Sequence, residues 1–509
     1  MFRKSKSILI VCFSFFLLAA CSTESANDEV RGEKEVNLLF NFATGSLDPH
    51  VDTSYVSLRA GITETLVHLN DEDLTIEPWL AESWDSKDGQ LWNFELREGV
   101  TFQNGKKMDG KAVKASLERA MKDSPAIKNA LRIESIEADG NALSIKTEVP
   151  FPEFPSELVH PNTSIIDVKE SDYINKPIGT GPFAVSKFMP GTAVDLIRYE
   201  PYWDGAAKLE RARFSFNEDA NARSLALESG DADIVFRPEV ESLENLEAID
   251  GVKVESTSTF RVHQMTMNLE REALQDIHVR KAIDALIDRS SIADTILHGH
   301  AEVATGPFPS TFSFAPDYPK KENGMEAAKG FLDQAGYKKV DGVMQKDGKP
   351  LTFTLLTYSS RADLPLIAQV FQSDAGQLGI DVKIKQIEIP EEYMAANRDW
   401  DLTTYSNLTA PRGDAGYYLN ATYHPKGALN FSGTDDDHLT SLIDKLNVTV
   451  EQEKRSDLAE DIAMYVDGHV YNSFILHPNT LVAYDADRVK NWITSRSEYY
   501  MLTNELDVK

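Results

Sequence analysis

Apolar and polar positions follow two different periods along the chain. The run VNLLFNF from Val36 and the run LTFTLLTY at 351–358 are continuous apolar segments of strand length, which is typical of buried strands. Gly110 to Met121, Val279 to Leu297 and Leu364 to Leu378 place apolar residues every three or four positions, as one face of a helix does. This alternation predicts an α/β fold with substantially parallel sheets.

The first 20 residues have a pattern of their own. Arg3, Lys4 and Lys6 precede the apolar run SILIVCFSFFLLAA, which is too short and wrongly flanked for a lasting transmembrane helix. We expect residues 1–20 to be a signal peptide, with an uncleaved anchor helix as the alternative. The run ends in Leu-Ala-Ala-Cys21, a lipobox. Acylation of Cys21, as by palmitate, would anchor the mature chain to the outer face of the cell membrane.

The other cysteine, Cys12, lies inside the predicted signal peptide. The mature chain therefore has no second thiol for a disulfide, a zinc cluster or a cysteine nucleophile. Residues 21–34 are polar and free of aromatic side chains, which predicts a flexible tether. The remaining chain is long enough for two lobes that each bury a core.

The charge of the chain is strongly negative. The formal net charge is −29, and loss of the three basic residues of the leader brings it near −32. Binding to nucleic acid or to anionic lipid needs clustered Lys and Arg, so this balance argues against both. Attraction of cationic solutes and adaptation to a salty or alkaline habitat are both compatible with it.

No repeat and no linker-like segment divides the chain, so the lobes must be intertwined. Apolar strands suited to crossing between lobes occur near 258–270 and 475–490. We therefore expect lobe one, with a subdomain, at 35–260 completed by 485–509, and lobe two at 261–484.

Several blocks in fixed order resemble one family. They are AESWDSKDGQLWNFELREGVTFQNGKKMDG from residue 81, IGTGPFAVSKF from 178 with Tyr202-Trp203, LALESGDADIVF from 225, DIHVRKAIDALIDRSSI from 276 and LNFSGTDDDHLTSLIDKL from 429. Together they are similar to the extracytoplasmic solute-binding proteins of family 5, which serve ABC importers for peptides, opines and nickel.

The resemblance implies a two-lobed clamp of the periplasmic-binding-protein type, with an extra subdomain on lobe one. It implies a monomeric lipoprotein that captures a small solute and hands it to an ABC permease driven by a cytoplasmic ATPase. It implies no enzymatic activity and no covalent group other than the lipid. Closure would rest on solute contacts with both lobes, because a ligand shifts such an equilibrium only through differential affinity.

The segment DWDLTTYSNLTAPRGDAGYYLNATYHPKG from residue 399 holds the candidate ligand contacts Tyr405, Arg412 and Asp414. The resemblance to peptide-binding members implies that Asp414 pairs with a ligand ammonium group, where a carboxylate would accept charge-assisted hydrogen bonds. A helix cap is the alternative interpretation of Asp414. Arg412 and Arg132 are candidates for a ligand carboxylate, although surface arginines are usually only solvated.

His424 lies shortly before the last of the family blocks, where the nickel-binding members carry a metal-contacting histidine. Imidazole suits Ni(II), and a free histidine or a metallophore would complete the coordination of a chelated ion. The chain departs from that pattern at Leu408-Thr409, and at His160 where an arginine is expected. His160 is either a second contact or a loop residue before Pro161.

The sequence therefore favours a nickel chelate as ligand and keeps an oligopeptide as the alternative. No HExxH, GxSxG, Walker or GxGxxG motif is present, which argues against a secreted hydrolase or a nucleotide-binding enzyme. A receptor-linked sensing role on the same scaffold stays open.

Overall fold

The computed structural model describes residues 34–509, apart from residues 71, 74, 170, 171 and 362. The predicted signal peptide, the lipidation site Cys21 and the predicted tether up to residue 33 lie outside the described residues. At Lys34 the chain is already held, because Nζ donates to Asp507 Oδ1 at 2.7 Å. Within the described part, no helix combines the length and the apolar character needed to cross a membrane.

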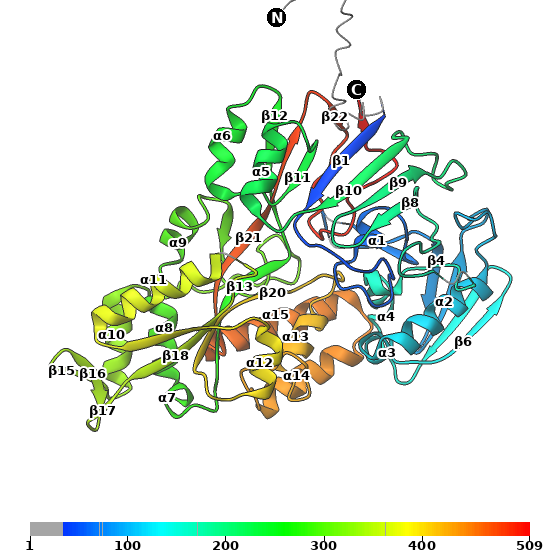
Figure 1. Cartoon of the computed structure of the whole chain (residues 1–509). Coiled ribbons are helices and arrows are strands. Elements are labelled where there is room, and N and C mark those ends of the chain that lie inside the picture. The colour runs from blue at the N-terminus through cyan, green and yellow to red at the C-terminus, as the bar shows by residue number, and fades with distance from the viewer. Residues whose placement is uncertain (1–33, 71, 74, 170–171, 362) are drawn as a thin grey trace, which may run out of the picture.

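A twelve-stranded sheet runs through the molecule (Figure 1). Its order is β19-β18-β20-β13-β21-β11-β1-β10-β9-β8, with β12 and β14 also paired to β21. The apolar runs predicted to be buried strands form β1 and β18. The strands are β1 (Glu35–Phe40), β8 (Phe183–Met189), β9 (Ala193–Arg198), β10 (Arg211–Phe216), β11 (Ile234–Phe236), β12 (Val252–Ser258), β13 (Arg261–Met267), β14 (Ala301–Val303), β18 (Thr352–Thr357), β19 (Asp381–Gln386), β20 (Leu402–Leu408) and β21 (Asn472–Asp485).

The long strand β21 joins the two halves of this sheet. Its first part pairs with β13 and β14, and its second part, from Asn479, pairs with β11 and β12. We use lobe one for residues 34–259 and 479–509, and lobe two for residues 260–478. The sequence-based limits at 260/261 and 484/485, as limits of separate domains, stay a prediction.

The sheet is mixed, which corrects the expectation of substantially parallel sheets. β1 is parallel to β10 and β11, and β18 is parallel to β19 and β20, whereas the other pairs of the sheet are antiparallel. Short turns such as the one through Gly191 between β8 and β9 can only join antiparallel neighbours. Apolar periodicity does not report this direction.

A separate four-stranded sheet with two helices against it forms the subdomain of lobe one (Figure 1). In β5 exposed and buried residues alternate, as expected for a sheet with one wet face. The first helix begins where the Asp109 carboxylate accepts the N–H of Ala112 at 3.0 Å. The elements are β4 (Ala81–Ser86), β5 (Leu91–Leu96), β6 (Ile133–Asp139), β7 (Ala142–Thr147), α2 (Gly110–Asp123) and α3 (Pro125–Leu131).

The helices cover the sheets, and one predicted helix is divided. Val279 to Leu297 forms α8 (Ile277–Leu286) and α9 (Arg289–Thr295), because the extended backbone of Ile287 ends the first helix and Asp288 caps the second, accepting the N–H of Ser291 at 3.0 Å. The other helices are α1 (Val56–Arg59), α4 (Phe154–Glu157), α5 (Ala220–Glu228), α6 (Leu243–Glu247), α7 (Glu272–Gln275), α10 (Met325–Gln334), α11 (Asp363–Leu378), α12 (Pro390–Ala396), α13 (Gly416–Tyr423), α14 (Asp437–Val448) and α15 (Gln452–His469).

The hydrophobic core does not stop at the lobe boundary. One cluster of buried side chains contains Phe94 and Leu117 of the subdomain together with Leu419, Ile443 and Ile462 of α13 to α15. The main sheet has its own clusters in lobe two and in lobe one. The subdomain and helices α13 to α15 therefore pack as one body beside the space between the lobes.

Candidate ligand-binding site

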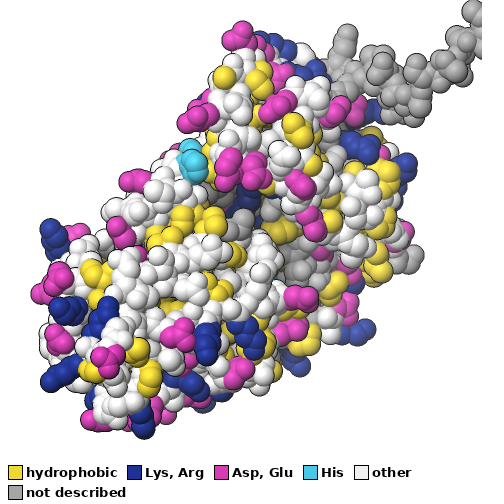
Figure 2. Space-filling view, turned by 60° about the vertical axis from the view of Figure 1, so that its left-hand side comes forward, with side chains coloured by type: hydrophobic (Ala, Val, Ile, Leu, Met, Phe, Trp, Pro, Cys, Tyr) yellow, Lys and Arg dark blue, Asp and Glu magenta, His cyan; other side chains and the backbone are white. Residues whose placement is uncertain are grey.

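A cavity of about 710 Å³ lies between the two lobes. Lobe one contributes the chain after β11 and the start of α5, and lobe two contributes β13 and the chain between β18 and α11. Figure 2 looks into this hollow and shows acidic side chains at its edge and basic ones deeper inside. The exposed acidic side chains of the lining are Glu218, Glu241 and Glu388.

Three arginines form the deeper wall, which we call the arginine floor: Arg237, Arg261 and Arg361. Arg237 Nη2 donates to Glu498 Oε1 at 2.6 Å, and Arg261 Nη1 donates to Ser406 Oγ at 3.3 Å. The buried Nε of Arg261 has no partner. For the side chain of Arg361 no hydrogen bond or ion pair is found among the described residues.

Glu498 is the carboxylate that these arginines share. Burial alone would raise its pKa, but the charges of Arg237, Arg261 and Arg59 outweigh burial and hold the pKa of Glu498 well below its usual range. Glu498 is therefore an anion at any physiological pH. It neutralises one of the three neighbouring cations.

Asp363 adds one more negative charge to the lining. Its Oδ2 lies 2.7 Å from Nε2 of the buried His263, and the charges of His263 and Arg361 hold the pKa of Asp363 low against the effect of burial. Burial and the charges of Arg261 and Arg237 together lower the pKa of Arg361. The floor is short of negative charge, which favours a ligand that carries carboxylates.

The backbone beside the floor is strained. Tyr55, Arg237 and Glu498 have φ angles of 53°, 53° and 63°, in the left-handed region that non-glycine residues rarely adopt. Such residues persist where the surrounding structure imposes them, and they gather at functional sites. Two of these residues, Arg237 and Glu498, form an ion pair with each other.

Beside the arginine floor, a second group of side chains between the lobes is rich in tyrosine. The ring of Tyr55 lies 5.6 Å from that of His160 and 6.1 Å from that of Tyr499, and the guanidinium of Arg412 lies 4.4 Å above the ring of Tyr417. In the part of the chain that the structure describes, the hydroxyls of these three tyrosines have no hydrogen-bond partner. They are donors available to a ligand.

Arg59 connects this tyrosine-rich end to the arginine floor. Its Nε donates to the carbonyl of Glu498 at 2.8 Å, and its guanidinium lies 5.6 Å from the ring centre of Tyr55. We call the arginine floor and this tyrosine-rich end, which Arg59 links, the seam. We take this seam as the candidate ligand-binding site.

Two of the residues singled out in the sequence lie together here. Arg412, from lobe two, forms an ion pair with Glu157 of α4 in lobe one, and its buried Nε has no partner. Burial and the Arg412 charge lower the pKa of His160, so His160 is neutral. Its Nδ1 accepts the N–H of Asn162 at 3.1 Å.

Asp414 and Tyr405 are engaged inside the protein. Arg455 Nη2 donates to Asp414 at 2.8 and 2.9 Å, and the N–H of Gly416 donates to Asp414 at 2.6 Å. Asp414 is thus bound within the protein, although the N-cap of α13 is Ala415, which has no side-chain cap; its role as an ammonium anchor stays a prediction. The hydroxyl of Tyr405 donates to Glu391 at 2.7 Å, and its ring lies in the core of lobe two.

None of the site residues predicted from the sequence, His424 and Arg132 included, is among the residues that line the interlobe cavity. His424 follows α13; its Nδ1 accepts the N–H of Lys426 at 3.1 Å and its Nε2 lies 3.4 Å from Asp444. Arg132 ends α3 in the subdomain, with its guanidinium over the ring of Phe151. Among the described residues, no three His, Cys, Asp or Glu side chains are grouped as a metal site would need.

The arginine floor was not identified from the sequence. Arg237 follows the strand DIVF and Arg361 follows the strand at 351–358, and ligands of α/β proteins bind beyond the carboxyl ends of strands. That position was a usable signal. The sequence could not show that the two strand ends face each other across the lobes.

Comparison with known proteins agrees with this architecture. The model of the bacterial extracellular solute-binding proteins, family 5 Middle, matches residues 75–430. The crystal structure of a nickel ABC transporter from Bacillus halodurans is 64% identical and covers 93% of this chain and 100% of its own, with a TM-score of 0.83. That of NikA from Staphylococcus aureus with Ni(L-His)2 is 33% identical over 94% and 100%, with a TM-score of 0.81.

The oligopeptide-binding protein AppA of Bacillus subtilis is 26% identical over 94% of this chain and 93% of its own length. Relatives of both ligand classes are thus present. The predicted fold class, a two-lobed α/β clamp, is confirmed, and so is the predicted family.

Proposed function

This chain belongs to family 5 of the bacterial extracellular solute-binding proteins, and we propose that it captures nickel as a histidine chelate and delivers it to an ABC importer. The single observation that carries the proposal is the arginine floor, where three guanidinium groups lie beside two carboxylates, Glu498 and Asp363. Carboxylates of a chelating amino acid supply the missing negative charge in bidentate hydrogen bonds. Ni(L-His)2, which NikA of Staphylococcus aureus holds, carries two such groups.

The chelator, rather than the protein, would supply most of the nickel coordination. Imidazole and amino nitrogens suit Ni(II), and a bis-histidine complex already provides them. The seam would recognise the outside of the complex through the arginines and through the tyrosine hydroxyls near His160. His424 stays a candidate for direct contact with the metal and would have to move to reach the seam.

Closure follows from the placement of the arginines. Arg237 belongs to lobe one and Arg361 to lobe two, so the two carboxylates of one chelate would contact both lobes. A ligand that contacts both lobes only when they are together shifts the clamp toward the closed state by that difference in affinity.

We further propose that Cys21 carries the lipid that holds the protein at the outer face of the membrane. A monomer anchored in this way would present the closed clamp to a permease, with a cytoplasmic ATPase on the other side. A binding role rather than catalysis accords with the family.

Calorimetric titration tests the ligand directly. We expect saturable binding of nickel in excess L-histidine, and no comparable heat with nickel alone or L-histidine alone. Saturable binding of a mixed peptide pool without metal would contradict the nickel proposal.

That outcome would make the chain a peptide-binding protein, the second candidate. The cavity of about 710 Å³ is the observation that favours it, because a peptide fills more space than a small chelate. The ammonium partner would then be Asp363 or the acidic edge of the cavity, because Asp414 is already bound by Arg455.

A further inference from the structure

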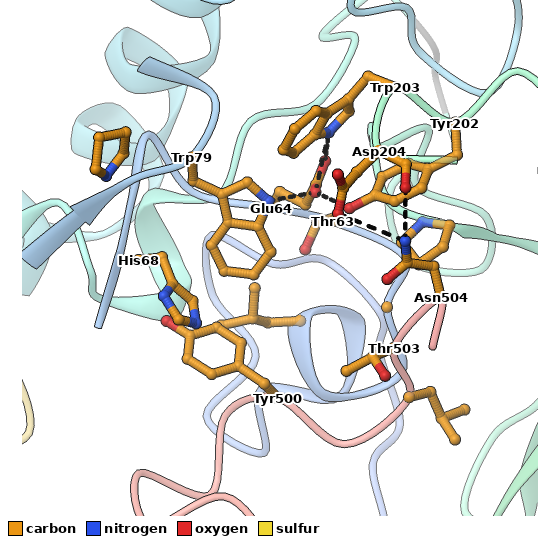
Figure 3. Close-up of a pocket in the computed structure, with 15 residues that line it drawn as sticks. Thr63, Glu64, His68, Trp79, Tyr202, Trp203, Asp204, Tyr500, Thr503 and Asn504 are labelled. Carbon is orange, nitrogen blue, oxygen red and sulfur yellow. Dashed lines mark hydrogen bonds between the residues drawn. The ribbon is translucent and has the colours of Figure 1, made fainter. Parts of the chain in front are cut away.

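A second cavity, of about 270 Å³, lies on lobe one and shares no lining residue with the interlobe cavity. Aromatic rings form much of its wall. Tyr500 lies with its ring centre 5.1 Å from that of Trp79 and 4.4 Å from that of His68, and Trp203 stands on the opposite side (Figure 3). Trp79, His68, Trp203 and Tyr500 are only half-buried, so the cavity is open to solvent.

Glu64 lies between the two indoles at the back of this cavity (Figure 3). Its side chain is buried, and it accepts the indole N–H of Trp79 at 2.5 Å and that of Trp203 at 3.2 Å. The hydroxyls of Tyr202 and Thr180 donate to it at 2.7 and 2.6 Å. No Lys, Arg or His forms an ion pair with Glu64 among the described residues.

The carboxylate changes what the rings can bind. An indole that donates its N–H to an anion becomes richer in electrons, and its face attracts cations more strongly. Trp203 already illustrates this preference, because the guanidinium of Arg97 lies 4.4 Å above its ring. Among the described residues, no Lys or Arg lies over the ring of Trp79 in the same way. Asp204, exposed at the edge of the cavity, adds a further negative charge.

We propose that this aromatic cavity, Trp79, Trp203, Tyr500 and His68 around Glu64, binds a small alkylated ammonium ion. A quaternary ammonium group matches it because such a cation is attracted by ring faces and by the carboxylate behind them, yet needs no hydrogen-bond acceptor. Both oxygens of Glu64 already accept hydrogen bonds, so a primary ammonium group would lose its own hydrogen bonds on entry. The inference does not depend on the ligand of the interlobe seam.

Choline and its neutral isostere 3,3-dimethyl-1-butanol provide a matched pair of probes. We expect choline to bind saturably to the purified protein, measured by calorimetry and by broadening of its methyl proton resonance, and the isostere to bind at least fivefold more weakly. Choline should still bind when nickel and L-histidine are present in excess. Equal binding of the isostere, no saturable binding of choline, or loss of choline binding on addition of nickel and histidine would each overturn the proposal.

Variants locate the site. Trp79→Leu should weaken choline binding about fivefold or more, as expected for the loss of a cation–π face. Trp84→Leu is the control, because Trp84 is a half-buried tryptophan of the subdomain that does not line the cavity. Glu64→Gln, with its fold checked by circular dichroism, should weaken choline but not the isostere. An equal effect of Trp84→Leu and Trp79→Leu would place the binding elsewhere.

Discussion

Two groups of arginines lie between the lobes, and they differ in how the protein neutralises them. In the first group, which we call the latch, Arg412 pairs with Glu157, and Arg455 pairs with Asp414 and Glu153. In the second group, the arginine floor, three guanidinium groups share Glu498 and Asp363. The arginines of the latch are buried and those of the floor are half-buried, and the two groups also differ in their counter-charges.

From that difference we infer different roles for the two groups: the latch stabilises the fold, and the arginine floor binds the ligand. A buried ion pair that is complete within the protein resists separation, because parting the charges leaves each of them desolvated. A buried cation without a sufficient counter-charge gains most when an external anion arrives. The latch thus holds lobe two against the subdomain side of lobe one, while the floor is suited to bind a carboxylate of the ligand.

Breaking the latch should have the largest effect. Arg455→Leu leaves Asp414 and Glu153 buried side by side without their cation, and we expect a loss of about 3–5 kcal/mol in the free energy of unfolding. Urea unfolding followed by circular dichroism measures it. Lys454→Met, next in sequence but exposed, should change stability by less than about 0.5 kcal/mol. A similar small value for Arg455→Leu would mean that the latch does not hold.

Removing a cation of the floor should act on binding instead. Arg361→Gln should reduce the affinity for nickel in excess histidine by about 10- to 100-fold, as expected for the loss of a charged hydrogen bond. The unliganded protein should be as stable as before or slightly more so, because the positive charges repel one another less. Lys383→Gln, on an exposed part of lobe two, is the control. If Arg361→Gln lowered the free energy of unfolding but left the affinity for nickel with histidine unchanged, Arg361 would have the structural role that we assign to the latch.

The latch should also depend on pH. Burial, reinforced by the charge of Asp414, raises the pKa of Glu153 to about 7 although Arg455 opposes it. The folded state thus binds this proton more tightly than the unfolded state, so the group's contribution to stability decreases as pH rises from its ordinary value to about 7. Glu153→Gln should be more stable than the natural chain by about 1–2 kcal/mol at pH 8. The difference should disappear near pH 4; one that persists there would have another cause.

The smallest effect is expected at His424. Its two ring nitrogens already have partners outside the seam, so His424→Ala should change the affinity for nickel with histidine by less than about twofold. The same calorimetric titration measures it, with His438→Ala as a matched surface control. A tenfold loss would show that this segment moves and that the histidine contacts the metal, as its position in the sequence suggested.

Much of the fold was accessible from the sequence. The runs that became β1 and β18, and the helical spacing of α2 and α11, reflect periods that a backbone imposes on whichever residues face the core. The motifs in family order determined the fold class. The sequence did not predict the direction of the strands or the break between α8 and α9, because neither changes the spacing of apolar residues.

The candidate site, like the fold, has features that the sequence indicated and features that it did not. The sequence by itself identified His160 and Arg412 as candidate ligand contacts and showed which family the chain resembles. Only the tertiary structure decided that Arg455 neutralises Asp414, while Arg361 has no hydrogen bond or ion pair through its side chain among the described residues. The reason is physical: hydrophobic periodicity is a local property of the backbone, whereas the charge balance of a buried group depends on side chains brought together from distant parts of the chain.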